Sequence, residues 1–274
     1  MRIYITFGDE AYRKTRDFSV KMAKLVGGFD KVIAYSPADI DIEFQKTHSD
    51  IFKIKRGYGL WLWKPFLIYK TLMEVCNDGD YLFYGDGGSF FFRSVETIEK
   101  SMQGSDIWVS CNSLVEWQFT KRDTFELMDC HGKEYEKTPQ AQGGFLYIRK
   151  SPVSISFVKQ WLDKCSDIRL LHPDNIASSQ ENPEGFVAHR EDQSVLSLLC
   201  KKKGIKFHLD PSQYGKYPEK YWQSGVERPN GFPMHEYSPS IILHRTPSRN
   251  VLTIVRQLVL CLIPRKIGLR LIHK

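Results

Sequence analysis

The sequence predicts an α/β protein in which a mostly parallel, Rossmann-like central sheet is flanked by helices. A strand–helix–strand unit fills the first 35 residues, and short apolar strands alternate with helices further along the chain. Of the 274 residues, 42% are hydrophobic and 26% are charged, the proportions of a chain that buries a sizeable core. We expect a single domain over residues 1–245, followed by a basic tail helix within residues 246–274.

The first unit is defined by its apolar pattern and its glycines. Residues 2–7 form an apolar strand that breaks at Gly8. Residues 10–26 carry apolar side chains at helical spacing, and the helix stops at a pair of glycines. A second strand follows at residues 31–35. Two strands joined by a helix in this way lie parallel, with a right-handed crossover.

The middle of the chain continues the alternation. Residues 65–76 form a mostly apolar helix with proline at its first position, where no backbone donor is lost. Residues 81–84 form a fully apolar strand, typical of a sheet centre. Further strands are predicted at residues 107–110 and 144–148, and a helix at residues 152–165.

The last third contains the clearest helix, over residues 191–203. It has acids in its first turn and lysines in its last, as the helix dipole favours. Short strands are predicted at residues 206–209 and 240–243. Residues 210–239 are rich in Tyr, Pro and Gly and predict a long loop of the kind that often carries function.

Charge and cysteines limit the location and the partners. All seven basic residues after Glu236 are unopposed, because that segment holds no acid, whereas residues 1–236 hold 32 basic and 32 acidic residues. A nucleic-acid-binding body is therefore not indicated. The six cysteines are scattered, with no CxxC pair, and no signal peptide or long apolar run is evident. These features predict a cytoplasmic protein.

Asp86 follows the apolar strand 81–84 within the sequence Gly85-Asp86-Gly87-Gly88. Ligands of open α/β sheets bind beyond the carboxyl ends of strands, and glycines let a ligand come close. A carboxylate at that edge suits Mg²⁺ or Mn²⁺ together with phosphate oxygens. The alternative is a tight turn stabilised by the Asp side chain.

The segment 56–65 places two Trp, one Tyr, Arg56 and Lys64 at the start of a buried helix. Aromatic faces stack on sugars or bases, and cations at a helix N-terminus hold phosphate. The alternative is that both Trp belong to the core and the cations are solvated.

Two further places carry candidate side chains. Asp192 and Gln193 open the clearest helix, so they either face a polar pocket or only complement the helix dipole. His244 directly follows an apolar strand, from which it either reaches a metal ion or serves as a structural residue. No GxSxG, Walker or GxGxxG sequence is present.

Together these segments resemble bacterial glycosyltransferases of the GT-A fold, related in pattern to the retaining galactosyltransferase and glycogenin group and to capsule and lipopolysaccharide enzymes. The resemblance spans residues 1 to about 245. It is carried by GYGLWLWKPFLIYKTL (57–72), GDYLFYGDGGSFF (79–91), QGGFLYIRK (142–150), HREDQSVLSLL (189–199) and IILHR (241–245).

The resemblance implies a nucleotide-sugar site whose Asp-x-Asp motif binds a divalent metal ion, Mn²⁺ or Mg²⁺, and the donor diphosphate. Asp86 matches the first Asp and His244 the later metal ligand, but Gly88 stands at the second Asp. Thr6, Phe7 and Gly8 match the place where the first strand meets the nucleotide base. Gly143 and Gly144 match a small-residue turn beside the donor sugar. Asp192 and Gln193 match a pair near the reacting carbon. Arg56 and Lys64 are candidates to share the charge of the leaving diphosphate.

The expected function is transfer of a sugar from a nucleotide-diphosphate donor, with a UDP-sugar as first choice, to a saccharide or lipid-linked acceptor in cell-surface polysaccharide synthesis. Two alternatives remain open. One is a non-catalytic carbohydrate-binding protein, supported by Gly88. The other is a glycoside hydrolase that uses Asp86 and Asp192 as its carboxylate pair. The basic tail predicts peripheral binding to an anionic membrane surface at the inner face; the alternative is a helix docked on the protein itself.

Overall fold

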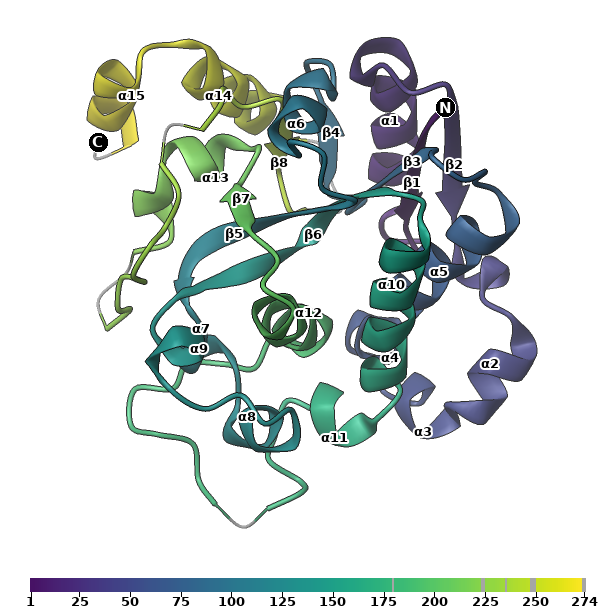
Figure 1. Cartoon of the computed structure of the whole chain (residues 1–274). Coiled ribbons are helices and arrows are strands. Elements are labelled where there is room, and N and C mark those ends of the chain that lie inside the picture. Colours follow the sequence, from purple (N-terminus) through teal and green to yellow (C-terminus); the bar gives the residue numbers. More distant parts are fainter. Residues whose placement is uncertain (179, 223–224, 235, 247–249, 273–274) are drawn as a thin grey trace.

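A six-stranded sheet in the order β2-β1-β3-β6-β5-β7 forms the centre of the molecule (Figure 1). The computed structural model describes the chain except residues 179, 223–224, 235, 247–249 and 273–274. The strands are β1 (Arg2–Phe7), β2 (Lys31–Tyr35), β3 (Tyr81–Gly85), β5 (Ile107–Val115), β6 (Pro139–Arg149) and β7 (Phe207–Leu209). β1 pairs in parallel with β2 and β3, and β5 in parallel with β7, which confirms the predicted parallel character and the first strand–helix–strand unit.

β6 runs against its two neighbours, β3 and β5. It begins five residues before the predicted strand, so Gly143 and Gly144 lie inside a strand and the expected small-residue turn is wrong. The pairing of β5 with β6 shifts register between Val109 and Val115, and irregular pairing of this kind commonly marks functional edges of sheets.

Helices cover one face of the sheet, and helices with a small second sheet cover the other (Figure 1). α5 (Trp63–Glu74), α10 (Pro152–Cys165) and α12 (Glu191–Lys202) pack with the larger apolar core. On the opposite face lie α1 (Arg13–Met22) with its π-helical end η1 (Ala23–Gly27), α6 (Glu96–Ser101), and the antiparallel pair β4 (Ser89–Phe91) and β8 (Ile241–Leu243).

Short helices fill the connections. They are η2 (Pro37–Asp39), α2 (Ile42–Thr47), α3 (Ser49–Phe52), α4 (Gly57–Leu60), α7 (Glu116–Phe119), α8 (Arg122–Leu127), α9 (Lys133–Glu136), α11 (Ile168–Leu171), α13 (Gln213–Lys216) and η3 (Pro218–Lys220). The last two interrupt the predicted loop 210–239. α1 starts three residues later than predicted, because Asp9 and Tyr12 form a turn before it.

The tail forms α14 (Val251–Leu262) and α15 (Arg265–Ile272), which lie beside α13 and β8 (Figure 1). Cys261 packs with Phe90 and Ile242 of the small sheet. The hydroxyl of Tyr217 donates to the carbonyl of Leu260 at 2.9 Å. One face of the tail is therefore docked on the protein, as the alternative interpretation expected. No helix in the described part of the chain is long and apolar enough to cross a membrane.

Candidate active site

A cleft of about 850 Å³ opens where β1 and β3 end, at the carboxyl edge of the parallel strands. Nine of the residues predicted for the site line it: Phe7, Gly8, Arg56, Lys64, Asp86, Gly143, Gly144, Asp192 and Gln193. Thr6 does not line it and is fully buried. Successive side chains of a strand point to opposite faces, so Thr6 points away from the side that Phe7 takes.

A buried ion pair lies at the floor of the cleft. Lys64, in the first turn of α5, places its Nζ 2.7 Å from Oδ2 of Asp192 and 3.9 Å from Oδ1 of Asp86. It also donates to the carbonyl of Gly143 at 3.0 Å. Burial raises the pKa of Asp192 to about 7 against the opposing effect of Lys64. Burial alone would lower the pKa of Lys64, but Asp192 and Asp86 hold it above its ordinary value.

Asp86 is the accessible carboxylate of this cluster, since 41% of its side chain is exposed against 5% for Asp192. Its backbone N–H donates to the carbonyl of Gly144 at 3.0 Å, which ties the loop to β6. The hydroxyl of Tyr84 donates to Oδ1 at 2.6 Å. The carbonyl of Asp86 accepts from the N–H of Ser89 at 3.0 Å, so a tight turn is present, but the backbone of Asp86 closes it and not the side chain that the alternative expected.

The segment between Arg56 and Lys64 forms a left-handed turn, since residues 57–61 all have φ between 51° and 82°. Left-handed backbone costs about 1–2 kcal/mol for each residue other than glycine, and strain of this kind collects at functional sites. The turn separates the two tryptophans. Both line the cleft: Trp63 is buried and stacks on Phe7 with ring centroids 3.8 Å apart, whereas Trp61 is half-buried beneath Arg56.

The start of α12 is held by charges and amides rather than by a side-chain cap. Glu191 has a φ of 42°, is buried, and accepts from Nε of Arg56 at 2.6 Å. Burial raises the pKa of Glu191 and the charge of Arg56 opposes that rise. Gln193 accepts from the N–H of Gly143 at 3.0 Å and donates to Oε1 of Gln140 at 2.6 Å, so its amide bridges α12 to β6.

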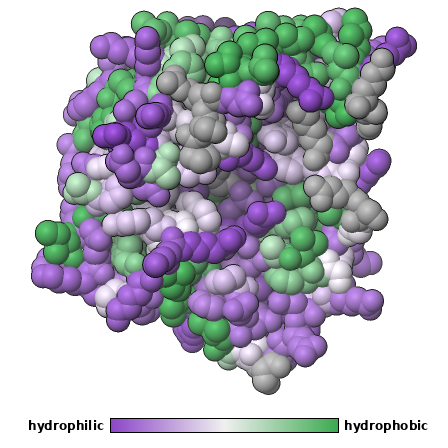
Figure 2. Space-filling model, turned by 180° about the vertical axis from the view of Figure 1, so that it is seen from behind, coloured by the Kyte–Doolittle hydropathy of each residue, from purple (hydrophilic) through white to green (hydrophobic). Residues whose placement is uncertain are grey.

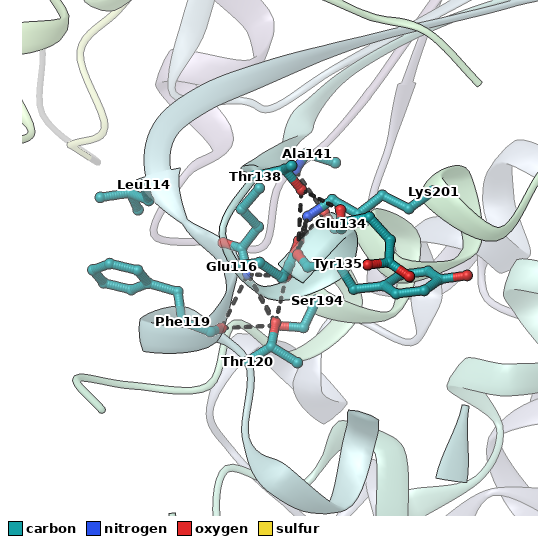
Figure 3. A network of polar contacts seen from close by, with 12 residues as sticks. Leu114, Glu116, Phe119, Thr120, Glu134, Tyr135, Thr138, Ala141, Ser194 and Lys201 are labelled. Carbon is teal, nitrogen blue, oxygen red and sulfur yellow. Dashed lines mark hydrogen bonds and ion pairs between the residues drawn. The ribbon is translucent and has the colours of Figure 1, made fainter. Parts of the chain in front are cut away.

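A buried polar network supports this bridge from behind (Figure 3). The amide of Gln140 donates to Oε1 of Glu116 at 3.0 Å. Glu116 also accepts from Thr120 at 2.5 Å and pairs with Nζ of Lys201 at 2.7 Å. Because these side chains come from α7, β6 and α12, they fix the start of α12 relative to the sheet.

The residues present do not fit the divalent metal ion that the resemblance implies. Asp86 faces the ammonium of Lys64, and Gly88 brings no carboxylate. His244 does not line the cleft; its ring lies against Phe90, with centroids 6.2 Å apart, and its Nδ1 is 3.4 Å from the hydroxyl of Thr246. In the described part of the chain, His, Cys, Asp and Glu nowhere gather in a group of three suited to a metal.

The cleft contains residues that the sequence analysis missed: Tyr12, Asn112, Arg190, Tyr214, Tyr221 and Arg245. The two tyrosines come from the predicted functional loop 210–239, and Arg245 adjoins His244 in the sequence. The composition of this loop and the position of Arg245 next to a candidate residue could therefore have identified these three residues from the sequence. Nothing local marks Asn112 as facing a cleft, because it lies within a strand whose residues are all buried.

Solved structures with a similar fold are glycosyltransferases. Mouse xyloside xylosyltransferase 1 matches with a TM-score of 0.50 and 10% identity, over 91% of this chain and 100% of that one. An active-site mutant of the galactosyltransferase LgtC matches with a TM-score of 0.50 and 12% identity, over 97% and 98%. The sequence matches no protein-family model and no curated protein. The chain therefore has the GT-A-like fold of these glycosyltransferases, as the sequence resemblance predicts.

Proposed function

We propose that this protein is a glycosyltransferase that moves a sugar from a nucleotide-diphosphate donor, with a UDP-sugar as first choice, to a saccharide or lipid-linked acceptor in cell-surface polysaccharide synthesis. The observation that carries the proposal is the cluster of Asp86, Lys64 and Asp192 in the cleft beyond β1 and β3. Nucleotide ligands of open α/β sheets bind at this edge, and the fold is shared with glycosyltransferases.

In the proposed reaction the bond between the sugar's anomeric carbon and the diphosphate oxygen breaks, and its electron pair stays on the departing nucleoside diphosphate. The acceptor oxygen forms the new bond to that carbon and gives up its proton. An inverting reaction needs a carboxylate base, for which Asp192 and Glu191 are the candidates. A retaining reaction needs none, since the departing diphosphate takes the proton.

The lining of the cleft suggests where each part of the donor binds. Phe7, Gly8 and Tyr12 offer a surface for the base at the end of β1. Gly143 and Gly144, expected beside the donor sugar, let Gln193 and Asp86 pack close to the sheet, because an added Cβ atom would come within 3.0 Å of these side chains. Asp192 and Gln193 lie beside Gly143: Lys64 pairs with Asp192 and donates to the carbonyl of Gly143, and Gln193 accepts from the N–H of Gly143.

The two alternatives have less support. A glycoside hydrolase needs one carboxylic acid and one carboxylate on either side of the bond, whereas Asp86 and Asp192 both face the same ammonium group of Lys64, at 3.9 Å and 2.7 Å. A non-catalytic sugar-binding protein would keep the aromatic lining but has no need of the buried charges, which are costly to maintain.

A screen of nucleoside diphosphates by thermal shift, with and without Mn²⁺ and Mg²⁺, tests the proposal directly. We expect one of them, UDP first, to raise the melting temperature. Incubation with the matching sugar donors should then release the nucleoside diphosphate, and more quickly when acceptor glycans are added. Sugar release from a glycan in the absence of donor would favour a hydrolase. Sugar binding without any nucleotide effect would favour the binding protein.

We also propose that the tail seats the enzyme on an anionic membrane surface. Seven exposed apolar side chains line its outer side: Val251, Leu252, Val255, Val259, Leu262, Ile267 and Leu271. Hydrophobic residues gather along the upper edge of the molecule in Figure 2, the edge at which Figure 1 places α14 and α15. Lys266 and Arg270 are exposed beside them. An apolar face flanked by cations is typical of helices that lie in a membrane interface.

A further inference from the structure

Two arginines face the cleft without an ion pair. Among the described residues, neither Arg190 nor Arg245 has a carboxylate oxygen within 4.0 Å, whereas Arg56 and Lys64 are paired with Glu191 and Asp192. An arginine is always charged, and a concave wall that carries two such groups favours an anion. The charges of Glu191 and Asp210 act on Arg190 and Arg245 from beyond ion-pair distance, so neither guanidinium group is in direct contact with a carboxylate.

Aromatic rings hold both guanidinium groups in place. Cζ of Arg245 lies 4.6 Å from the ring centroid of Tyr214 and 5.1 Å from that of Tyr221, whose hydroxyl accepts from Nη2. Cζ of Arg190 lies 5.2 Å from the ring centroid of Phe119. Stacking occupies the flat face of a guanidinium and leaves N–H groups at its edge for oxygen acceptors. Both arginines are thus held by contacts that do not neutralise their charge.

The backbone of Arg245 lies beside the loop position that lacks a carboxylate. The carbonyl of Gly88 accepts from the N–H groups of His244 at 2.9 Å and Arg245 at 3.1 Å. A Cβ atom at Gly88 would lie 3.2 Å from Cα of Arg245, which leaves a larger side chain little room. The loop position that lacks an acid, residue 88, therefore lies next to an arginine that lines the cleft.

We infer that Arg190 and Arg245 bind the diphosphate of the nucleotide-sugar donor directly, in the role that a divalent metal ion and its carboxylates would otherwise fill. This inference rests on the proposed glycosyltransferase function. A nucleoside diphosphate ester carries two negative charges, which two guanidinium groups offset. Their N–H edges match phosphate oxygens, and fixed cations stabilise the charge that develops when the diphosphate departs.

Calorimetric titration of the full chain with UDP, in EDTA and again in Mn²⁺, tests the inference. We expect the dissociation constant in EDTA to lie within about 2-fold of that in Mn²⁺. Arg245→Gln and Arg190→Gln should each weaken UDP binding about 10-fold or more, the effect of losing a charged hydrogen bond to phosphate. Uridine, which lacks phosphate, should bind all variants equally. Arg245→Lys should recover part of the affinity, because it keeps the charge but not the fork.

The matched control is Arg169→Gln, which removes an exposed arginine of α11 that does not line the cleft. It should leave UDP affinity unchanged, and melting temperatures will show that every variant folds. UDP binding that requires Mn²⁺, or arginine variants that bind UDP like the control, would overturn the inference and leave the glycosyltransferase proposal standing. If no nucleoside diphosphate of the thermal-shift panel binds under either condition, both fail.

Discussion

The ammonium of Lys64 lies 2.7 Å from the carboxylate of Asp192, and both side chains are at least 95% buried. These residues are brought together by the packing of α5 and α12 on the same face of the sheet. A buried pair of this kind adds little net stability but is costly to break, because one charge is then left without a partner. The pair therefore links the stability of the fold to the geometry of the cleft.

Lys64→Met should lower the free energy of unfolding by about 3 kcal/mol at pH 8, where buried Asp192 loses its charge partner or must take up a proton. The loss should shrink toward pH 5, because the pKa of Asp192, already raised to about 7 beside Lys64, rises further without that ammonium and the buried carboxyl is then protonated. Urea unfolding at the two pH values measures this. Lys159→Met, which breaks an exposed pair with Asp163, should cost less than about 1 kcal/mol at either pH.

Asp86→Asn should lower sugar transfer by about 100-fold or more, as removal of a group that stabilises charge typically does. The substitution keeps the size of the side chain and its contact with the hydroxyl of Tyr84. Initial rates with the donor identified by the thermal-shift screen measure the effect. Full activity in a folded Asp86→Asn protein would remove Asp86 from the proposed donor site.

Gln193→Ala should reduce transfer more than it reduces UDP affinity. Its amide joins Gly143 to Gln140, so its loss frees the N–H of Gly143 and loosens the start of α12, where the sugar is expected. Asp192→Ala should act in the same direction with a larger loss of stability. Turnover and calorimetry on the same samples separate the two effects. Equal losses of transfer and affinity, together with a lower melting temperature, would instead indicate a purely structural role.

His189 should make the protein less stable in acid. Burial, and after it the charge of Lys121, lowers its pKa from 6.5 to about 3, while the carbonyl of Leu170 beside Nε2 opposes the shift. Its Nδ1 accepts from the N–H of Lys121. A histidine with a lowered pKa in the folded state stabilises the fold above pH 6.5, and that stability is lost as the pH falls toward 3. The slope for one proton is about 1.4 kcal/mol per pH unit.

Urea unfolding at pH 6.5 and pH 5 therefore distinguishes His189 from other titrating groups. His189→Gln keeps both hydrogen bonds available and removes the titration, so it should lose about 2 kcal/mol less than the parent protein over this range. His131→Gln, at an exposed position, should follow the parent. Identical slopes for all three proteins would show that His189 does not couple folding to protons.

Local sequence patterns predict the elements that bury one continuous face. β1, β2, β3, α10 and α12 lie within one or two residues of their predicted bounds, because apolar spacing and terminal residues define them. The direction of β6 was not predictable, since it depends on which distant strands it pairs with. β4 has only three residues and no pattern of its own; its partner β8 makes it a strand.

Some residues of the candidate site were likewise predictable from local sequence patterns, and others were not. Asp86 and Asp192 were predicted because each directly follows or opens a recognisable element. Arg245 was missed, since its place in the cleft depends on its distant contact with Gly88 and on two tyrosines of an irregular loop. Thr6 was misplaced by one position, the smallest shift that turns a strand residue to the other face.

The membrane proposal for the tail is tested on the full chain, because α14 also covers apolar side chains of β4 and β8 and its removal would expose them. The side chains of Leu252 and Val255 are 81% and 50% exposed, so Leu252→Gln with Val255→Gln alters the outer side alone. The parent protein should pellet with vesicles of anionic lipid at low salt, and the double variant should remain largely in the supernatant.

The cations of the tail should also contribute to vesicle binding. Each cation near an anionic leaflet contributes about 1 kcal/mol, so Lys266→Gln with Arg270→Gln should weaken vesicle binding by about 10-fold or more at low salt. Raising the salt concentration should reduce the difference, because ions screen the surface potential. Ile42→Gln, at a side chain 68% exposed on α2, is the matched control and should pellet like the parent. If the parent itself stays in the supernatant at low salt, the outer side of the tail does not bind membranes, and docking on β4 and β8 is its role.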